Sequence, residues 1–336
     1  MRQKTLVYAN TIDWDFKGLT QRPHHLMKLL AERNWKVYYV NQTQRADRVR
    51  ERICENLEVY HNWNVFLKRV PECDVYFSSW ANRYVDLDKI KAKVVVYDSL
   101  DAFPDHEPNE LKMINRADIV LAASQPLYDL RSQQHKNVHL CKNACFEEHG
   151  FMEYEVPHDL VNFKKTGKPI ILFSGALSST WCDLELVEKV AKRFTLVVVG
   201  RGWAISQMPN GVHYLGQKTH DELQAYYRHC DVNILPFQKN QIGVYSSPIK
   251  KFEAMIHGTP TVATDIPEAL AYEGVVLTST SHEEFINNIK KAIQLKKCDD
   301  YKNKAITTGK ENTWKSRVDV IDSAITQFCL EKGITL

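Results

Sequence analysis

Short apolar runs alternate with segments of helical periodicity along the whole chain. Continuous apolar runs of this length are typical of strands buried on both faces, and the intervening segments repeat their apolar positions every three or four residues, as amphipathic helices do. The pattern predicts strands at residues 5–9, 36–40, 75–77, 94–98, 119–124, 138–140, 169–173, 195–200, 212–215, 232–236, 259–264 and 275–278. Two such sets in series predict two doubly wound α/β domains with parallel sheets.

The predicted break between the two sets lies in a polar, turn-rich stretch at residues 150–168. We therefore expect an N-terminal domain over residues 1–160 and a second domain over residues 161–310. Residues 311–336 show only helical periodicity and are expected to form a C-terminal helix. A length of 336 residues agrees with two domains, because single cores rarely grow beyond about 250–300 residues.

The composition, 44% hydrophobic and 25% charged, is that of a globular protein. A net charge of +3 is too small to favour nucleic-acid binding, which needs a strongly basic face. No uncharged apolar window is long enough for a membrane span, and the first apolar run is too short for a signal peptide. The eight cysteines show no zinc-site spacing. The sequence thus predicts a cytoplasmic protein without a bound metal or cofactor.

The most informative segment is residues 247–265, where a helix with polar positions leads through His-Gly-Thr-Pro into an apolar strand. Lys250 and Glu253 are three positions apart and share one face of that helix. A helix N-terminus favours an anion, so a diphosphate could lie against the helix start and Lys250, while Glu253 accepts hydrogen bonds from ribose hydroxyls. Ser246 and Ser247 would then donate to phosphate or simply cap the helix. The alternative is an ordinary surface helix with solvated Lys250 and Glu253.

The same segment contains Pro-x-Lys-x-x-Glu-x-x-x-x-Gly-x-Pro-x-Val-x-Thr, which resembles the donor-site signature of GT-B glycosyltransferases. Further matching segments follow in the same order along most of the chain. In these segments the chain is similar to retaining family 4 glycosyltransferases and to bacterial surface-polysaccharide enzymes of the teichuronic-acid type. The further matching segments are residues 21–27, 97–103, 116–120, 143–144, 173–177, 181–183, 212–216 and 230–237. The resemblance implies two Rossmann-like domains, a C-terminal helix crossing back to the first, and a nucleotide-sugar donor held by Glu253 and Lys250.

Other donor-binding candidates follow predicted strands. Gly175 lacks a side chain where backbone could approach phosphate, although a plain turn glycine is the alternative. Arg201 follows Gly200 at a strand end and, with Lys251, is expected to supply positive charge. Arg22 lies at a helix start in the first domain, where it would approach the donor phosphates or the acceptor, or only stabilise a loop.

The catalytic candidates are in the first domain. Asp98 and Asp101 follow a buried strand at its carboxyl end, the edge where ligands bind in such sheets. A carboxylate there could act as the base of an inverting transfer, or only orient groups in a retaining one. His24, near the helix start, is the third candidate, and His106 is a weaker one.

Two departures from the family pattern leave the sugar and the stereochemical course open. Tyr245 stands eight positions before Glu253, where many retaining members carry a second Glu, and residues 178–181 lack the cations that such members place in this loop.

The basic segment 45–52 could meet an anionic membrane or a lipid-pyrophosphate acceptor, or could be a solvated helix.

Together these features predict a metal-independent glycosyltransferase, with UDP favoured over GDP in the donor and a saccharide or lipid-linked saccharide as acceptor. It would act in bacterial surface-polysaccharide synthesis, in the cytoplasm or at the inner face of the membrane. The alternatives are a nucleotide-sugar epimerase and a non-catalytic sugar-nucleotide-binding subunit of a polysaccharide assembly complex.

Overall fold

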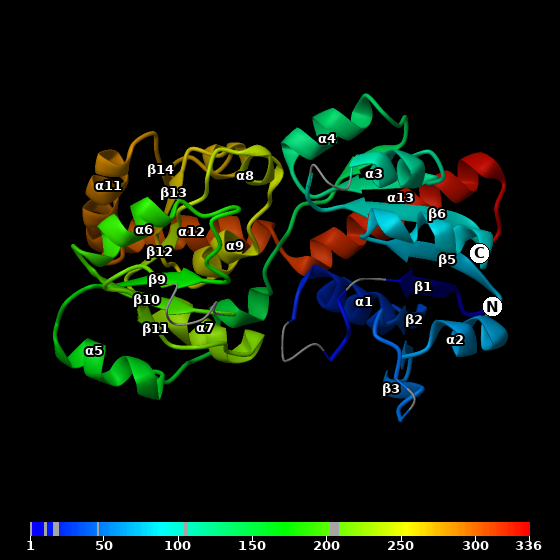
Figure 1. Cartoon of the computed structure of the whole chain (residues 1–336), viewed down its shortest axis with the longest axis horizontal. Coiled ribbons are helices and arrows are strands. Elements are labelled where there is room, and N and C mark those ends of the chain that lie inside the picture. The colour runs from blue at the N-terminus through cyan, green and yellow to red at the C-terminus, as the bar shows by residue number, and fades with distance from the viewer. Residues whose placement is uncertain (1, 10–11, 16–19, 46, 104–106, 202–207) are drawn as a thin grey trace. The chain divides into compact units, whose positions relative to one another are not determined.

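The computed structural model describes residues 2–9, 12–15, 20–45, 47–103, 107–201 and 208–336. The chain forms two compact units (Figure 1). Unit 1 comprises Met1–Lys142 and Trp314–Leu336, and unit 2 comprises Asn143–Thr313. Each unit is built around its own sheet.

The sheet of unit 1 has the strand order β3-β4-β2-β1-β5-β6-β7-β8. Its strands are β1 (Thr5–Ala9), β2 (Lys36–Val40), β3 (Arg50–Cys54), β4 (Leu57–Tyr60), β5 (Glu72–Ser78), β6 (Lys91–Ser99), β7 (Ile119–Ala122) and β8 (Val138–Leu140). All neighbouring pairs are parallel except β3 and β4, which form an antiparallel hairpin at one edge. The inner strands β1 and β7 are buried almost throughout, as expected of a sheet covered on both faces.

The helical elements of unit 1 are α1 (Arg22–Glu32), α2 (Trp63–Arg69), η1 (Ala81–Asp88), α3 (Glu107–Ile114), α4 (Gln125–Ser132) and α13 (Trp314–Lys332). Local sequence explains where several of them begin. Asn62 and Ser124 accept hydrogen bonds from the first turns of α2 and α4, and Pro23 occupies the first turn of α1.

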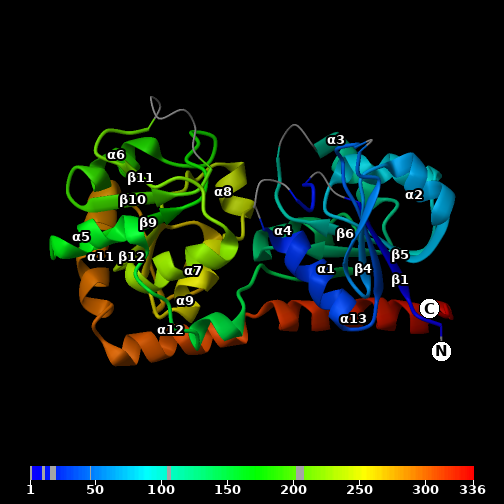
Figure 2. The same cartoon turned by 90° about the horizontal axis from the view of Figure 1, so that it is seen from below.

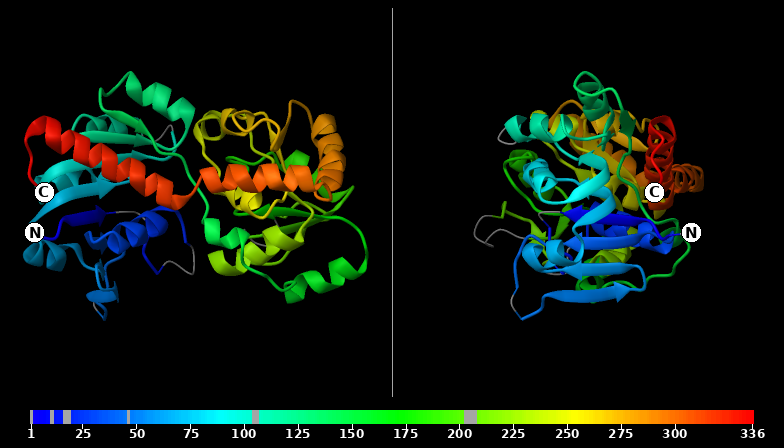
Figure 3. Two further views of the ribbon diagram at one scale, coloured as in Figure 1. Left: turned by 180° about the vertical axis from the view of Figure 1, so that it is seen from behind. Right: turned by 90° about the vertical axis from the view of Figure 1, so that its right-hand side faces the viewer.

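The C-terminal helix α13 packs beside α1 within unit 1 (Figures 2 and 3). The rings of His25 and Trp314 lie 4.9 Å apart, and Trp314 is fully buried. Arg33 Nη1 lies 2.7 Å from Asp319 Oδ1, and Trp35 donates to Asp322 Oδ1 at 3.0 Å. The last residues of the chain are therefore part of the unit that contains the first ones.

The sheet of unit 2 has the order β11-β10-β9-β12-β13-β14, and all its pairs are parallel. Its strands are β9 (Ile170–Ser174), β10 (Thr195–Val199), β11 (His213–Tyr214), β12 (Val232–Leu235), β13 (Thr261–Thr264) and β14 (Val276–Ser279). Side chains of β9 alternate between two cores. Ile171 and Phe173 face the core that α6 (Leu184–Ala191) and α11 (His282–Leu295) cover, and Ile170 and Leu172 face the one that α7 (His220–His229) covers.

The helical elements of unit 2 are η3 (Glu147–Gly150), η4 (His158–Leu160), α5 (Val161–Lys165), α6 (Leu184–Ala191), α7 (His220–His229), α8 (Gln241–Tyr245), α9 (Ile249–Ile256), α10 (Pro267–Leu270), α11 (His282–Leu295) and α12 (Asp299–Glu311). Two of them matter most for the site. A capping box between Thr219 and Glu222 starts α7, and α9 begins after Pro248.

The predicted strands are confirmed with shifts of one to a few residues at their ends, but β3 and β4 were missed. The alternative that segment 45–52 is a solvated helix is wrong for its last residues, because the chain from Arg50 onward forms the edge strand β3. Edge strands carry charged, exposed side chains, so β3 lacks the apolar run by which buried strands are recognised.

The boundary between the units differs from the predicted one. Residues 143–160 belong to unit 2, not to the first domain. Asn143 Nδ2 donates to Ser247 O at 2.5 Å and Cys145 N to Asn312 O at 3.1 Å, so the segment is bonded into unit 2 before the polar stretch begins. The segment that returns to unit 1 starts at Trp314 rather than at residue 311.

Candidate functional site

The carboxyl ends of β9 and β10 bring two glycines together in unit 2. Gly175 follows β9 with φ +121°, and Gly200 follows β10 with φ +151°. A Cβ on Gly200 would lie 2.4 Å from the backbone oxygen of Gly175, and one on Gly175 would lie 2.4 Å from Lys250 Nζ. Both positions therefore require glycine, and the Lys250 ammonium lies directly against the backbone of Gly175.

Lys250 is half-buried on the first turn of α9. Its Nζ lies 4.7 Å from the ring centre of Phe173 and 5.5 Å from that of Phe237. Among the residues that the structure describes, no carboxylate is in ion-pair distance of this ammonium, and burial lowers the pKa of Lys250. A cation placed against aromatic faces and glycine backbone attracts an anion.

The start of α9 adds hydrogen-bond donors to this cation. Ser247 is 5% exposed, and its hydroxyl has no partner within the described part of the chain. No side chain caps the first turn at Pro248, so the first backbone N–H groups of the eight-residue helix lack a cap. Ser246, in contrast, donates to Gly243 O at 3.0 Å and stabilises the turn after α8.

Glu253 lies one turn further along α9 and is 4% exposed. Its Oε1 accepts hydrogen bonds from His220 Nε2 at 2.5 Å and Gln224 Nε2 at 3.5 Å. Burial by itself would raise the pKa of Glu253, but the charge of His220 and the hydrogen bonds of His220 and Tyr227 outweigh it and hold this pKa below its usual value. The carboxylate is thus kept ionised.

Sequence reasoning missed His220 and Gln224. Both lie on α7, on the turn that follows the Thr219 cap, and neither belongs to a motif that names a function. The capping box could have located the helix start, but nothing in the local sequence indicates that this face of α7 packs against α9.

Arg201 and Lys251, the two other predicted sources of positive charge, differ in their exposure. Arg201 follows Gly200 and is exposed, and Gly202 lies outside the described residues. Lys251 is fully buried, with Nζ 2.8 Å from Glu268 Oε2 and 3.0 Å from the backbone oxygen of Glu268. Its charge is neutralised there, so Lys251 does not contribute to the anion site.

In unit 1, Arg22 and Asp98 form a buried ion pair with each other. Arg22 Nη2 lies 2.8 Å from Asp98 Oδ1 and Arg22 Nε 2.9 Å from Oδ2, while Ser79 Oγ donates to Oδ2 at 2.9 Å. Asp98 is 0% and Arg22 2% exposed. A buried charge is costly unless an opposite charge compensates it, and these two side chains compensate each other. The arrangement therefore disfavours Arg22 as a phosphate ligand and Asp98 as a base.

His24 is buried at the start of α1 and caps it. Its Nδ1 accepts from Gln21 N at 3.1 Å, and its Nε2 lies 3.4 Å from Asp13 O. Burial lowers its pKa despite these contacts, so the ring is neutral around pH 7. The local contacts indicate a structural role. His106 lies outside the described residues.

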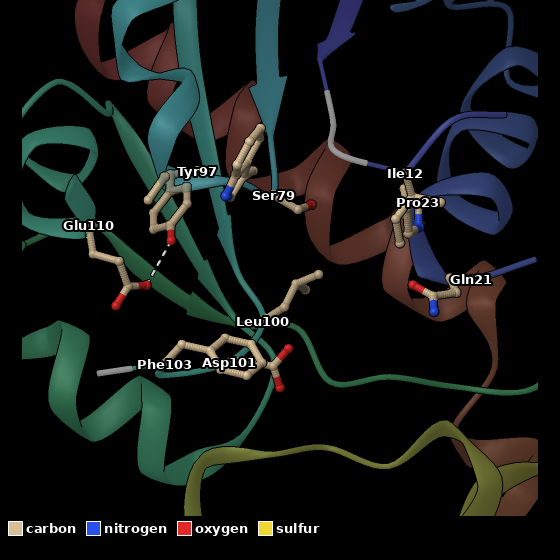
Figure 4. A pocket seen from close by; sticks show the side chains of 11 residues that line it. Ile12, Gln21, Pro23, Ser79, Tyr97, Leu100, Asp101, Phe103 and Glu110 are labelled. Atoms are coloured by element: carbon tan, nitrogen blue, oxygen red, sulfur yellow. Dashed lines mark hydrogen bonds between the residues drawn. The ribbon is translucent and has the colours of Figure 1, made fainter. Parts of the chain in front are cut away.

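Asp101 lines a pocket of about 370 Å³ in unit 1 (Figure 4). The lining combines aromatic or aliphatic faces with polar groups: Ile12, Gln21, Pro23, Ser79, Trp80, Ala81, Tyr97, Leu100, Asp101, Phe103 and Glu110. Figure 4 shows Leu100, Asp101 and Phe103 on one side and Ile12, Pro23 and Gln21 across from them. Burial, and then the charge of Glu110, raise the pKa of Asp101 to about 6.

The arginines of the basic segment 45–52 are largely paired. Arg45 lies 2.6 Å from Asp15, Arg48 3.1 Å from Glu51 and Arg50 3.3 Å from Glu58, and Ala46 lies outside the described residues. The carboxylates of Asp15 and Glu58 offset part of the positive charge of the segment.

No helix in the described ranges is both long and apolar enough to span a membrane. Those ranges also contain no cluster of three or more His, Cys, Asp or Glu side chains arranged for a metal ion.

Residues 168–294, which lie within unit 2, match the family model described as Glycosyl transferases group 1. No sequence among the curated proteins matches the chain.

Solved structures resemble nearly the whole chain. Anabaena HepE in complex with UDP aligns over 96% of this chain and 100% of its own, with a TM-score of 0.71 at 15% identity. An α,α-trehalose 6-phosphate synthase from Burkholderia multivorans aligns over 99% and 100%, with 0.73 at 10% identity. WaaG, a glycosyltransferase involved in lipopolysaccharide biosynthesis, aligns over 95% and 98%, with 0.63 at 12% identity. The predicted GT-B fold is confirmed.

Proposed function

We propose that this protein is a glycosyltransferase that moves a sugar from a nucleoside diphosphate donor to a saccharide or lipid-linked saccharide. The observation that carries the proposal is the arrangement around α9: an ammonium without a carboxylate partner in the described chain against glycine backbone, an unpartnered Ser247 hydroxyl, and an ionised Glu253 one turn away. It lies in the part of the chain that matches the family model.

The diphosphate would lie at the N-terminus of α9, against Gly175 and Lys250. Backbone N–H groups, the Ser247 hydroxyl and the ammonium can bind its oxygens, and they stabilise the negative charge that grows on the diphosphate as the sugar leaves. These groups supply fixed positive charge without a metal ion, on which the proposed metal independence rests. Glu253 would accept hydrogen bonds from the ribose. Arg201 follows β10 at the carboxyl edge of the sheet, and Ser246 lies between α8 and α9.

UDP is the proposed nucleotide. HepE has been crystallised with UDP, with UDP and glucose, and with UDP-glucose. This similarity in fold supports testing UDP first and GDP second. WaaG acts in lipopolysaccharide biosynthesis, which supports the proposed role in bacterial surface-polysaccharide synthesis.

The acceptor would bind in the pocket of unit 1. Aromatic faces such as Trp80 and Phe103 stack on sugar rings, and carboxylates such as Asp101 accept hydrogen bonds from sugar hydroxyls. Asp101 is the proposed base if the transfer inverts the anomeric centre, and an acceptor-orienting group if it retains it. A lipid-linked acceptor would bring the enzyme to the inner face of the membrane, where the basic segment 45–52 is the proposed contact.

The test is calorimetric titration with UDP, GDP and their common sugar conjugates, using the native protein and Glu253→Ala. We expect micromolar binding of one nucleotide and a loss of about 10- to 100-fold in the variant, because charge-assisted hydrogen bonds to the ribose contribute roughly 1.5–3 kcal/mol each. Equal affinity of the two proteins would remove Glu253 from the donor site.

The second candidate is a non-catalytic sugar-nucleotide-binding subunit. The buried pairing of Asp98 with Arg22, together with Tyr245 in place of a Glu, favours it. Donor turnover measured with and without candidate acceptors separates the two: nucleotide binding without any turnover supports the subunit, and release of nucleoside diphosphate that depends on acceptor supports the transferase.

A further inference from the structure

His220 and Glu253 form a short ion pair between two largely buried side chains. His220 Nε2 lies 2.5 Å from Glu253 Oε1, and the two side chains are 12% and 5% exposed. The hydrogen bond from Gln224 ends on the same oxygen. Both donors come from α7, and both contact Oε1 of the carboxylate.

Other titratable groups surround the pair. Asp221 is next to His220 on α7, with Oδ1 3.8 Å from His220 Nδ1, and is almost fully exposed. His149 of η3 stands edge-on to His220 at 5.6 Å between ring centres, and its Nδ1 lies 2.8 Å from the hydroxyl of Tyr154. The ring of Phe146 also stands edge-on to that of His220, at 6.2 Å between ring centres.

Three of the remaining neighbours, His149, His257 and Tyr227, carry no positive charge at neutral pH, whereas the Lys250 ammonium of α9 also interacts electrostatically with Glu253. Burial lowers the pKa of His149. Burial above all lowers the pKa of His257 to about 3, although its Nε2 lies 2.9 Å from Gln224 Oε1. Burial also raises the pKa of Tyr227, which stays a neutral phenol. Compared with these three neighbours, His220 is the group whose charge compensates Glu253.

The pKa of His220 is raised by its partner. Burial alone would lower its pKa, but the charge and the hydrogen bond of Glu253 raise it above the ordinary histidine value. The imidazolium is therefore the main form at and somewhat above pH 6.5, and it is lost as the pH rises through the raised pKa.

We propose that His220 is a positioning residue of the donor site, whose imidazolium keeps the Glu253 carboxylate ionised and oriented for the ribose and adds a positive charge near the donor phosphates. This inference rests on the proposed function. Binding of an anionic donor then favours the protonated histidine, and by linkage protonation favours binding. Donor affinity falls as the pH rises through the titration of His220.

Calorimetric titration with UDP-glucose between about pH 6 and about pH 8.5 tests this inference. UDP-glucose is the better probe because its diphosphate is esterified at both ends and does not titrate in this range, unlike the terminal phosphate of UDP. The native protein is compared with His220→Gln, which keeps an amide donor but cannot titrate. His213→Gln is the matched control, since His213 is an exposed histidine of the same unit that contacts Phe163 instead.

We expect native affinity to fall about tenfold across this range, the His213→Gln profile to follow it, and the His220→Gln profile to be flat. Equal slopes in the native protein and His220→Gln, or tighter binding by His220→Gln at all pH values, would overturn the role of His220 and leave the donor site intact. If native protein and both variants bind no UDP-glucose or GDP-sugar at any pH, the proposed function fails and this inference with it.

A second measurement needs no nucleotide. Following the His220 imidazole proton by NMR gives its pKa directly, in the native protein and in Glu253→Gln. The native pKa is expected above 6.5 and to drop in the variant, because the neutral amide no longer favours the imidazolium. An unchanged pKa would show that the two groups are not coupled, which overturns the inference even if His220→Gln folds poorly.

Discussion

Gly175 and Lys250 are far apart in the sequence, yet a methyl group on residue 175 would lie 2.4 Å from the Lys250 ammonium. The side chain of Lys250 crosses the space that a Cβ would fill and rests against Phe173 and Phe237. At the residue scale, the position of the Lys250 ammonium depends on the absence of a side chain at Gly175. The surroundings of a residue also set its acidity. Burial and the charge of Glu110 raise the pKa of Asp101 above the ordinary value of an aspartate.

Gly175→Ala is expected to weaken both folding and donor binding. The backbone at φ +121° is strained for alanine, at a cost of roughly 1–3 kcal/mol, and the new methyl group must displace the ammonium. We expect about tenfold weaker nucleotide binding by calorimetry and a lower Tm. Gly167→Ala is the control: Gly167 also has positive φ, but a methyl group there would meet no described atom within 4 Å, so Tm should fall with affinity unchanged. Equal affinities of both variants and the native protein would argue against contact of Lys250 with the diphosphate.

The pH dependence of transfer should reveal the state of Asp101. Because its pKa is raised to about 6, the carboxylate forms as the pH rises through 6, and an acceptor-dependent kcat/KM should rise with it. Folding changes in the opposite sense. A carboxyl whose pKa is higher in the folded than in the unfolded chain stabilises the fold at low pH and less so as the pH rises from about 4 to about 6.

Asp101→Asn should remove the rise in rate near pH 6 and slow transfer about 10²- to 10⁴-fold if Asp101 is the base. A variant with native rates and the native pH profile would assign the step to another group and leave Asp101 as a pocket residue.

At the scale of elements, side chains that looked catalytic in the sequence join helices to strands. Arg22 and Asp98 connect the start of α1 to the end of β6, and His24 closes the first turn of α1. Polar residues at the carboxyl ends of parallel strands serve either ligands or loops, and local sequence does not distinguish the two uses. Likewise, β3 was missed because its exposed, charged residues show no apolar run.

Asp98→Asn should therefore be a stability variant. Removing one partner leaves the Arg22 guanidinium buried without a counter-charge, which typically costs about 3–5 kcal/mol, and urea unfolding measures the loss. The double variant Arg22→Met with Asp98→Asn should recover part of it, because the unpaired charge is gone. A lower transfer rate at native stability in Asp98→Asn would instead return Asp98 to a catalytic role.

At the scale of the molecule, the two units have different proposed tasks. Unit 2 contains the anion site at α9 and the match to the family model, and unit 1 contains the pocket with Asp101. The chain enters unit 2 at Asn143 and returns to unit 1 at Trp314. The returning segment forms α13. Its Trp314 contacts His25 of α1, and its Asp322 accepts a hydrogen bond from Trp35, which follows α1.

The two parallel sheets can be predicted from the amino-acid sequence, because buried strands and amphipathic helices have different apolar periods along the chain. The placement of Lys250 and Glu253 on one helix is also predictable, since three-residue spacing is a local property. Which distant groups meet, in contrast, depends on the packing of the folded chain. Arg22 pairs with Asp98, Lys251 with Glu268 and His220 with Glu253. Each of these pairs depends on how separate elements pack, and periodicity along the chain contains no information on which charged faces will share a buried space.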